Sequence, residues 1–257
     1  MDDAFALLRL QVEWGADEAI TIEPLDRMRP AEVHAEPVLR AVPPAAEPAP
    51  IGTAAERAVG LAGSAATLDE LRAALAGFDG CALRDTASHL VFAEGDPAGT
   101  TLIIGEPPGR EEDRSGHPFA GHEGALLDQM LASIGLTRSA LMLAPLVPWR
   151  PPGGRPINPG ELAACLPFLH RLITLLQPRR LVIFGGTASR VLLTPNAVRR
   201  RPARGWTEAR IPGLTDTLPA LALPGMAEML KTPSVRRDAW AGLRLLRRAL
   251  DEELTKT

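Results

Sequence analysis

The sequence predicts an α/β protein, a three-layer α/β/α sandwich with a central four-stranded parallel sheet. Short apolar runs of strand length alternate with longer segments whose apolar residues recur at helical spacing, a pattern typical of sheets covered by helices. The runs are bounded by Gly and Pro, and with 46% apolar residues the 257-residue chain can bury one sizeable core. The four runs predicted to be strands are 101–104, 140–144, 181–184 and 220–223.

Helices are predicted between and around these strands. The best-marked one begins at Asn158, a capping residue followed by Pro159 at the first helical position and Glu161 at the third. Its leucines continue at helical spacing to residue 176. The other predicted helices are 68–75, 123–134, 186–193 and 234–250.

The first part of the chain has a different composition. Residues 1–22 carry an amphipathic pattern that predicts a short N-terminal helix, and residues 23–54 are rich in Pro, Ala and Glu without any period. Such a segment predicts a disordered linker. We therefore expect the α/β domain to occupy residues 55–257.

Charge is distributed unevenly along the chain. Residues 1–99 carry a formal charge of −10, whereas residues 100–257 carry +7. The basic part suits contact with phosphates, and a solvated surface explains it equally well. Apolar runs are too short to span a bilayer and the first residues are acidic, so we expect a cytoplasmic protein with no membrane contact.

The strand at 101–104 leads into the most informative loop of the sequence. Gly, Pro and four acidic residues follow it between Gly105 and Asp113. Open α/β folds build their sites at the carboxyl ends of parallel strands, so this loop is a candidate active-site loop. Metal-dependent hydrolysis is a weaker alternative, because the histidines lack ligand spacing.

This region resembles the uracil-DNA glycosylase superfamily, in particular its iron-sulfur branch, family four. The resemblance extends over about residues 67–250, with the motifs in family order. The motifs that carry it are 105–113, 117–119, 123–128, 147–153, 165–169, 184–188 and 231–240.

The resemblance implies a pocket for a base swung out of the DNA. Phe119 would stack on the base, beside a wall formed by Gly105 and Pro107. Glu106 and Glu112 match acidic family positions and would orient water or stabilise the sugar cation. An ordinary core phenylalanine and a solvated acidic loop are the alternatives for these residues.

Three positions of the family motifs differ in this chain. Pro145 stands where the family has the Asn that reads the uracil edge, and Gly154 replaces a second Asn. Proline offers no side-chain hydrogen bond and no backbone N–H. Leu223 replaces the His that donates to the developing uracil anion; His117 or His122 is a candidate substitute.

The resemblance also implies a four-cysteine cluster that this chain cannot supply. Only Cys81 and Cys165 are present, and Phe78 and Trp149 stand at the other ligand positions. A complete 4Fe-4S cluster needs four thiolates. We therefore expect no cofactor and two buried remnant cysteines.

The predicted partner is DNA, single-stranded or damaged, bound by a monomer. Relatives approach phosphates with the loops that correspond to Arg150, Arg155, Gly186 and Arg201, although solvated arginines and a packing Gly-Gly turn are the alternatives. Two functions follow. The chain is either a glycosylase that removes uracil or another deaminated base, or a degenerate glycosylase fold that binds nucleic acid or acts as a scaffold.

Overall fold

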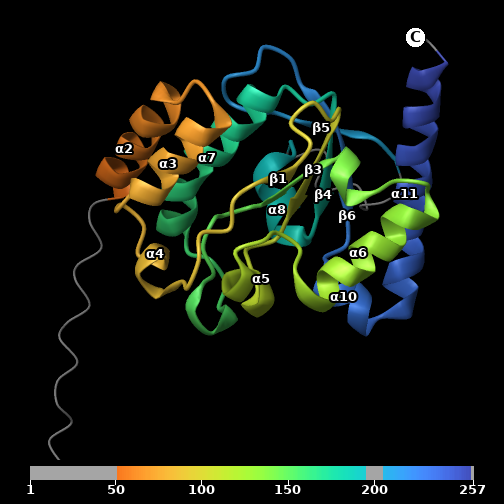
Figure 1. Cartoon of the computed structure of the whole chain (residues 1–257), viewed down its shortest axis with the longest axis horizontal. Coiled ribbons are helices and arrows are strands. Elements are labelled where there is room, and N and C mark those ends of the chain that lie inside the picture. Colours follow the sequence, from red (N-terminus) through yellow and green to blue (C-terminus); the bar gives the residue numbers. More distant parts are fainter. Residues whose placement is uncertain (1–50, 195–204, 256–257) are drawn as a thin grey trace, which may run out of the picture. The chain divides into compact units, whose positions relative to one another are not determined.

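A computed structural model describes residues 51–194 and 205–255 (Figure 1). The predicted N-terminal helix and most of the predicted linker lie outside this part of the chain. Helix α2 (Ile51–Ser64) begins four residues before the predicted domain start. Its alanines pack on the domain, since Ala58 and Ala62 are buried, so residues 51–54 belong to a helix rather than to the linker.

The central sheet has six strands in the order β1-β3-β2-β4-β6-β5. The four predicted strands are its parallel middle: β2 (Thr101–Gly105), β3 (Met142–Pro145), β4 (Arg180–Phe184) and β6 (Leu218–Leu223). Two short antiparallel strands that the sequence did not predict, β1 (Glu94–Gly95) and β5 (Thr207–Ala209), form the edges. With two and three residues, they are too short to show an alternating pattern.

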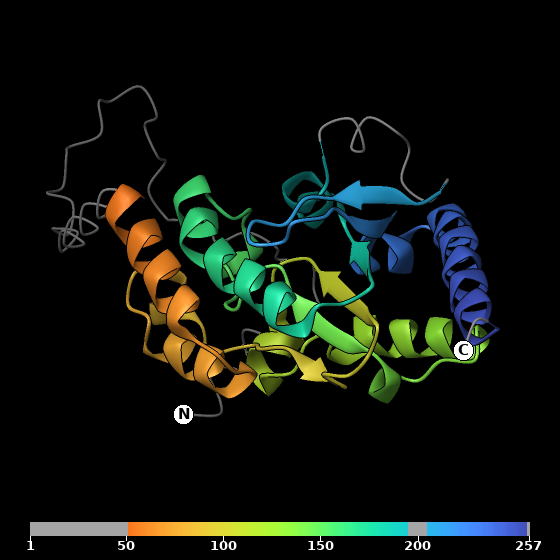
Figure 2. The ribbon, with the colours of Figure 1, turned by 90° about the horizontal axis from the view of Figure 1, so that it is seen from above.

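Helices cover both faces of the sheet, as Figures 1 and 2 show, and this confirms the predicted three-layer sandwich. Alternate residues of β2 enter different cores: Ile104 packs in the core on one face and Ile103 in the core on the other. One face carries α2, α3 (Leu68–Gly77), α7 (Pro159–Leu176) and α8 (Gly186–Leu192). The opposite face carries α6 (Gly121–Ser133), α10 (Met226–Lys231) and α11 (Pro233–Leu254).

The predicted start of the long helix is confirmed in detail. Asn158 Oδ1 accepts a hydrogen bond from the backbone N–H of Glu161 at 2.8 Å, and the Glu161 carboxylate accepts one from the N–H of Asn158 at 3.0 Å. This reciprocal cap satisfies two donors that the first helical turn would otherwise leave unpaired. No helix in the described ranges combines the length and apolar character that a bilayer crossing requires.

The chain reverses its direction of winding between β2 and β4. Strand β3, which follows β2 in the chain, lies on one side of β2, and β4, which follows β3, lies on the other side of β2. The loops that leave β2 and β4 therefore diverge and open a crevice at the carboxyl edge of the sheet. Gly105 pairs in register with Pro145, and Phe184 pairs with Leu223, so all four parallel strands end at this edge.

Candidate active site

A cavity of about 180 Å³ lies at this edge of the sheet. Six of the residues that the sequence assigned to the site line it: Gly105, Glu106, Pro107, Glu112, Phe119 and Pro145. An apolar cavity of about 150 Å³ takes up benzene, so this volume accommodates one six-membered ring. The predicted hollow beside Glu106 is therefore present.

Glu106 bridges the two diverging loops. Its Oε1 atom accepts a hydrogen bond from the backbone N–H of Thr187, in the first turn of α8, at 2.8 Å. Gly185 makes room for the carboxylate: a Cβ atom there would lie 2.1 Å from Glu106 Oε1, and its φ of +103° disfavours other residues. The fold thus fixes one oxygen of Glu106 beside the cavity.

Phe119 lies against the backbone at the end of β2. A Cβ atom on Gly105 would lie 2.8 Å from Phe119 Cζ, so the glycine allows the ring to approach the strand. Phe184 supports the ring edge-on, with 6.2 Å between the centroids and 75° between the planes. The Phe119 side chain is largely buried, with 5% exposed, and it still lines the cavity.

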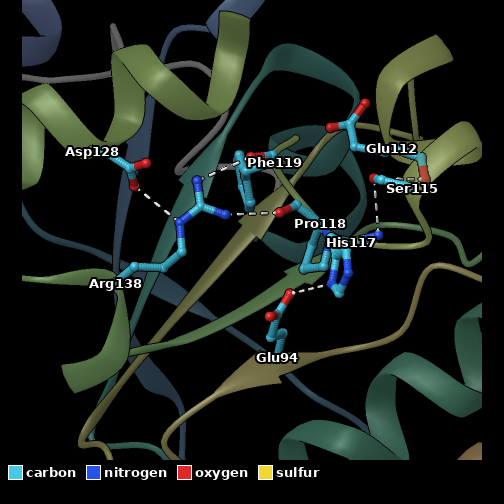
Figure 3. A network of polar contacts seen from close by, with 8 residues as sticks. All are labelled: Glu94, Glu112, Ser115, His117, Pro118, Phe119, Asp128 and Arg138. Carbon is cyan, nitrogen blue, oxygen red and sulfur yellow. Dashed lines mark hydrogen bonds and ion pairs between the residues drawn. The ribbon is translucent and has the colours of Figure 1, made fainter. Parts of the chain in front are cut away.

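Arg138 fixes the strained backbone that carries this ring. Phe119 has a φ of +52°, which is unusual for a bulky residue and needs support from its surroundings. Figure 3 shows the Arg138 guanidinium reaching the carbonyls of Pro118 at 3.1 Å and Phe119 at 3.0 Å. The same group pairs with Asp128 at 2.9 Å, and this pairing orients the guanidinium.

Glu112 lies in α5 (Arg110–Ser115), the short helix that follows the loop after β2. Its Oε2 atom accepts a hydrogen bond from the N–H of Gly109 at 2.7 Å and caps the helix that it belongs to. Burial raises the pKa of Glu112, and the negative charge of Glu123 raises it further. Glu112 therefore combines a structural contact with a position in the cavity wall.

The sequence pattern did not identify Glu123 as a site residue. Glu123 lies in the first turn of α6, four residues after Phe119, and its side chain lines the cavity. Burial raises its pKa, as does the charge of Glu106, while Lys231 acts in the opposite direction. Glu123 is the first residue of the 123–128 motif of the family resemblance, and that position is the signal that was available.

Leu223 does not line the cavity, which corrects its assignment as a base-binding residue. The side chain is buried and points toward α11, where a Cβ atom on Gly242 would lie 2.3 Å from Leu223 Cδ2. A leucine at the end of this strand gains more from the apolar core than from a partly polar cavity. His117 pairs with Glu94 at 3.1 Å (Figure 3). Neither His117 nor His122 lines the cavity.

The predicted phosphate contacts have different surroundings. Arg155 pairs with both carboxylate oxygens of the buried Glu161, which balances its charge. Gly186 begins α8, whose next N–H binds Glu106 rather than an external anion. Arg150 is half-buried and forms no ion pair with any described residue, so its charge stays available, while Arg201 lies outside the described residues.

The cysteine pair does not fit a 4Fe-4S cluster. Cys81 and Cys165 are both buried, with 3.7 Å between their sulfurs, and the other two ligand positions hold the buried rings of Phe78 and Trp149. Phe78 packs on Phe168 at 5.2 Å and fills the space beside the thiols. The hydrogen bond to Cys81 and burial raise the pKa of the Cys165 thiol well above its usual value.

No group of three or more His, Cys, Asp or Glu residues in the described ranges is arranged to hold a metal ion. The three cavity carboxylates do not form such a group either. The metal-dependent alternative therefore finds no donor set in this part of the chain.

The fold and the site define an α/β protein with a base-sized cavity at the switch point of a parallel sheet. The family model described as "Uracil DNA glycosylase superfamily" matches residues 92–244, and the chain belongs to this superfamily. Type-4 uracil-DNA glycosylases are among the curated proteins it resembles.

Three of these relatives show how far the likeness extends. The Pyrobaculum aerophilum protein is 35% identical over 126 residues, covering 49% of this chain and 64% of the relative. The Thermotoga maritima protein is 34% identical over 125 residues, covering 49% and 65%. The Archaeoglobus fulgidus protein is 36% identical over 112 residues, covering 44% and 56%. The matches thus span less than two thirds of these relatives.

Proposed function

We propose that this protein hydrolyses the N-glycosidic bond of uracil or another deaminated base in DNA. One observation carries the proposal: a cavity sized for a single ring contains both Phe119 and Glu106 at the carboxyl edge of the sheet. Its relatives in Pyrobaculum aerophilum and Thermotoga maritima are named Type-4 uracil-DNA glycosylases, which supports the same reaction class.

The cavity residues have chemistry suited to this reaction. Bond cleavage generates positive charge on the sugar and negative charge on the departing base. Glu106 would stabilise the sugar cation or orient the attacking water with the oxygen that Thr187 does not bind. Stacking on Phe119 would contribute about 1–3 kcal/mol to binding of the flipped base.

We propose DNA as the partner, contacted by a monomer in the cytoplasm. Arg150 is the described phosphate-contact candidate whose charge is not balanced by a neighbouring acid. Arg201 is a second candidate from outside the described residues. The excess of basic residues after residue 100 supports attraction to a polyanion.

A catalytically degenerate fold that binds nucleic acid is the second candidate function. It is favoured by Pro145, which lines the cavity without a side-chain hydrogen bond, and by Leu223, which points into the core. Loss of one donor to a developing oxyanion costs about 2.7–4 kcal/mol, a factor of 10² to 10³ in rate. In this second function the protein retains the fold and binds nucleic acid but does not hydrolyse the glycosidic bond.

Excision assays separate the two functions. Single- and double-stranded oligonucleotides containing uracil, hypoxanthine or xanthine would be incubated with the protein, and abasic sites would be measured by strand scission after alkali. Release of any of these bases supports the glycosylase. Salt-dependent binding without release of any base contradicts the glycosylase and supports the degenerate binder.

We further propose that the protein works without an iron-sulfur cluster, because aromatic rings occupy two of the four ligand positions. Protein purified anaerobically is expected to be colourless, with no charge-transfer absorbance in the visible range and no stoichiometric iron. A brown preparation that contains iron would contradict this expectation, since it would require ligands other than four cysteines.

A further inference from the structure

The cavity contains few side chains that can form hydrogen bonds with a base. Its described wall consists of Gly, Pro, Phe, Met and Ala apart from three glutamates: Glu106, Glu112 and Glu123. Glu106 already binds the N–H of Thr187, and Glu112 already binds that of Gly109. No hydrogen bond from any described residue reaches the Glu123 carboxylate.

We propose that Glu123 reads the hydrogen-bonding edge of the base in this cavity, in place of the amide that Pro145 cannot supply. The inference rests on the proposed function, because it assumes that the cavity takes up a nucleobase. It adds a base-binding residue and the kind of base edge with which this residue can pair.

The protonation state of a carboxyl group decides which edge it matches. Uracil and hypoxanthine each present a ring N–H donor beside a carbonyl acceptor. A protonated carboxyl has an O–H donor and a C=O acceptor, so it pairs with both groups, as a side-chain amide does. An ionised carboxylate has only acceptors, so it would bind the N–H and repel the neighbouring carbonyl.

The surroundings of Glu123 raise its pKa and so make its protonation easier than that of an exposed glutamate. Burial raises its pKa first, and the charge of Glu106 from the loop after β2 adds to this effect, while Lys231 of α10 opposes it. Glu112 of α5 is a second acid close enough to interact electrostatically with Glu123. The guanidinium of Arg138 is bound to backbone carbonyls, including that of Gly124, and to Asp128.

A protonated Glu123 can therefore form two hydrogen bonds with the N–H and carbonyl edge of a deaminated base. Because either of its oxygens can carry the proton, it can also pair with the amino and ring-nitrogen edge of cytosine, so Glu123 provides binding to a base edge rather than selection against cytosine. Protonation increases as the pH falls through the raised pKa of Glu123. Base recognition is therefore expected to be strongest on the acidic side and to weaken as the pH rises.

Glu123→Gln and Glu123→Ala test the proposal, with Glu228→Gln as the matched control. Glu228 is an exposed acid on α10 that does not line the cavity. Single-turnover excision of uracil would be measured from about pH 5 to pH 8. The wild type and E228Q should lose rate as the pH rises, whereas E123Q should lose this dependence and exceed the wild type at the highest pH.

The alanine variant removes both hydrogen bonds at every pH. We expect E123A to be slower than the wild type by about tenfold at the acidic end. A pH profile of E123Q that matches the wild type, or an E123A variant with wild-type rates, would overturn the proposal. Thermal melting of each variant distinguishes loss of recognition from loss of folding.

Binding measurements separate this proposal from the proposed function. Fluorescence anisotropy would compare strands that contain uracil, cytosine or an abasic site at one position. If the wild type releases no base but binds the uracil strand more tightly than the abasic strand, and E123A loses that difference, the glycosylase proposal is contradicted and the role of Glu123 is supported. If the wild type binds the uracil strand no more tightly than the abasic strand, the role of Glu123 is overturned whatever the excision result.

Discussion

Glu106→Gln is expected to lower the rate of base excision by about 10²–10⁴-fold, the range for loss of a positioned acid–base group. Glutamine keeps the size of the side chain and an oxygen that can accept the N–H of Thr187. It removes the negative charge that would face the sugar cation. Single-turnover kinetics on a uracil-containing strand measure the change, and DNA affinity should stay within about twofold.

Gly185→Ala provides an independent test of the same carboxylate. The added methyl group would lie 2.1–2.5 Å from atoms of Glu106, so the carboxylate must move even though its charge is retained. A comparable loss of rate is expected. Wild-type rates in E106Q would show that the carboxylate has no role in the reaction, and wild-type rates in G185A alone would show that its position is not critical.

Phe119→Ala should reduce both base binding and stability. Loss of stacking would lower the affinity for the flipped base by about 1–3 kcal/mol, or roughly 5- to 150-fold. The same change removes a buried ring from the core formed with Phe184 and is expected to cost about 3–5 kcal/mol of the free energy of unfolding. Urea denaturation and single-turnover excision measure the two effects separately.

Phe168→Ala is the matched control. Phe168 is also a buried ring in an aromatic pair, but it packs against Phe78 in the core on the other face of the sheet. Its loss should destabilise the protein by a similar amount while the folded fraction excises at the wild-type rate. Equal losses of excision in both variants would mean that Phe119 acts through folding alone.

The parallel middle of the sheet was predictable from local sequence because its strands are buried on both faces. Such strands are continuous apolar runs, and 101–104 and 181–184 are of this kind. The cap at Asn158 was predictable because it needs only residues three positions apart. The two edge strands were not predictable, since they are too short to show a pattern, and β1 also pairs with a strand that is distant in sequence.

The residues of the site also divide into those that the sequence identified and those that only the structure revealed. Phe119 and Glu106 were identified through the family resemblance of the loop after β2, and both line one cavity in the structure. Glu123 was missed because its role depends on how α6 docks beside that loop. The pairing of Arg155 with Glu161 was missed because the sequence does not say which acid a given arginine faces.

The sequence by itself determined the layers of this protein, the acidic loop at the end of the first parallel strand, and the shortage of cysteines for a cluster. Each of these follows from residue type and local spacing. Only the tertiary structure decided that Gly185 clears space for Glu106, that Leu223 turns toward Gly242, and that three carboxylates share one cavity. These features arise from contacts between segments up to 81 residues apart, where side-chain direction and packing, rather than local propensity, determine which groups meet.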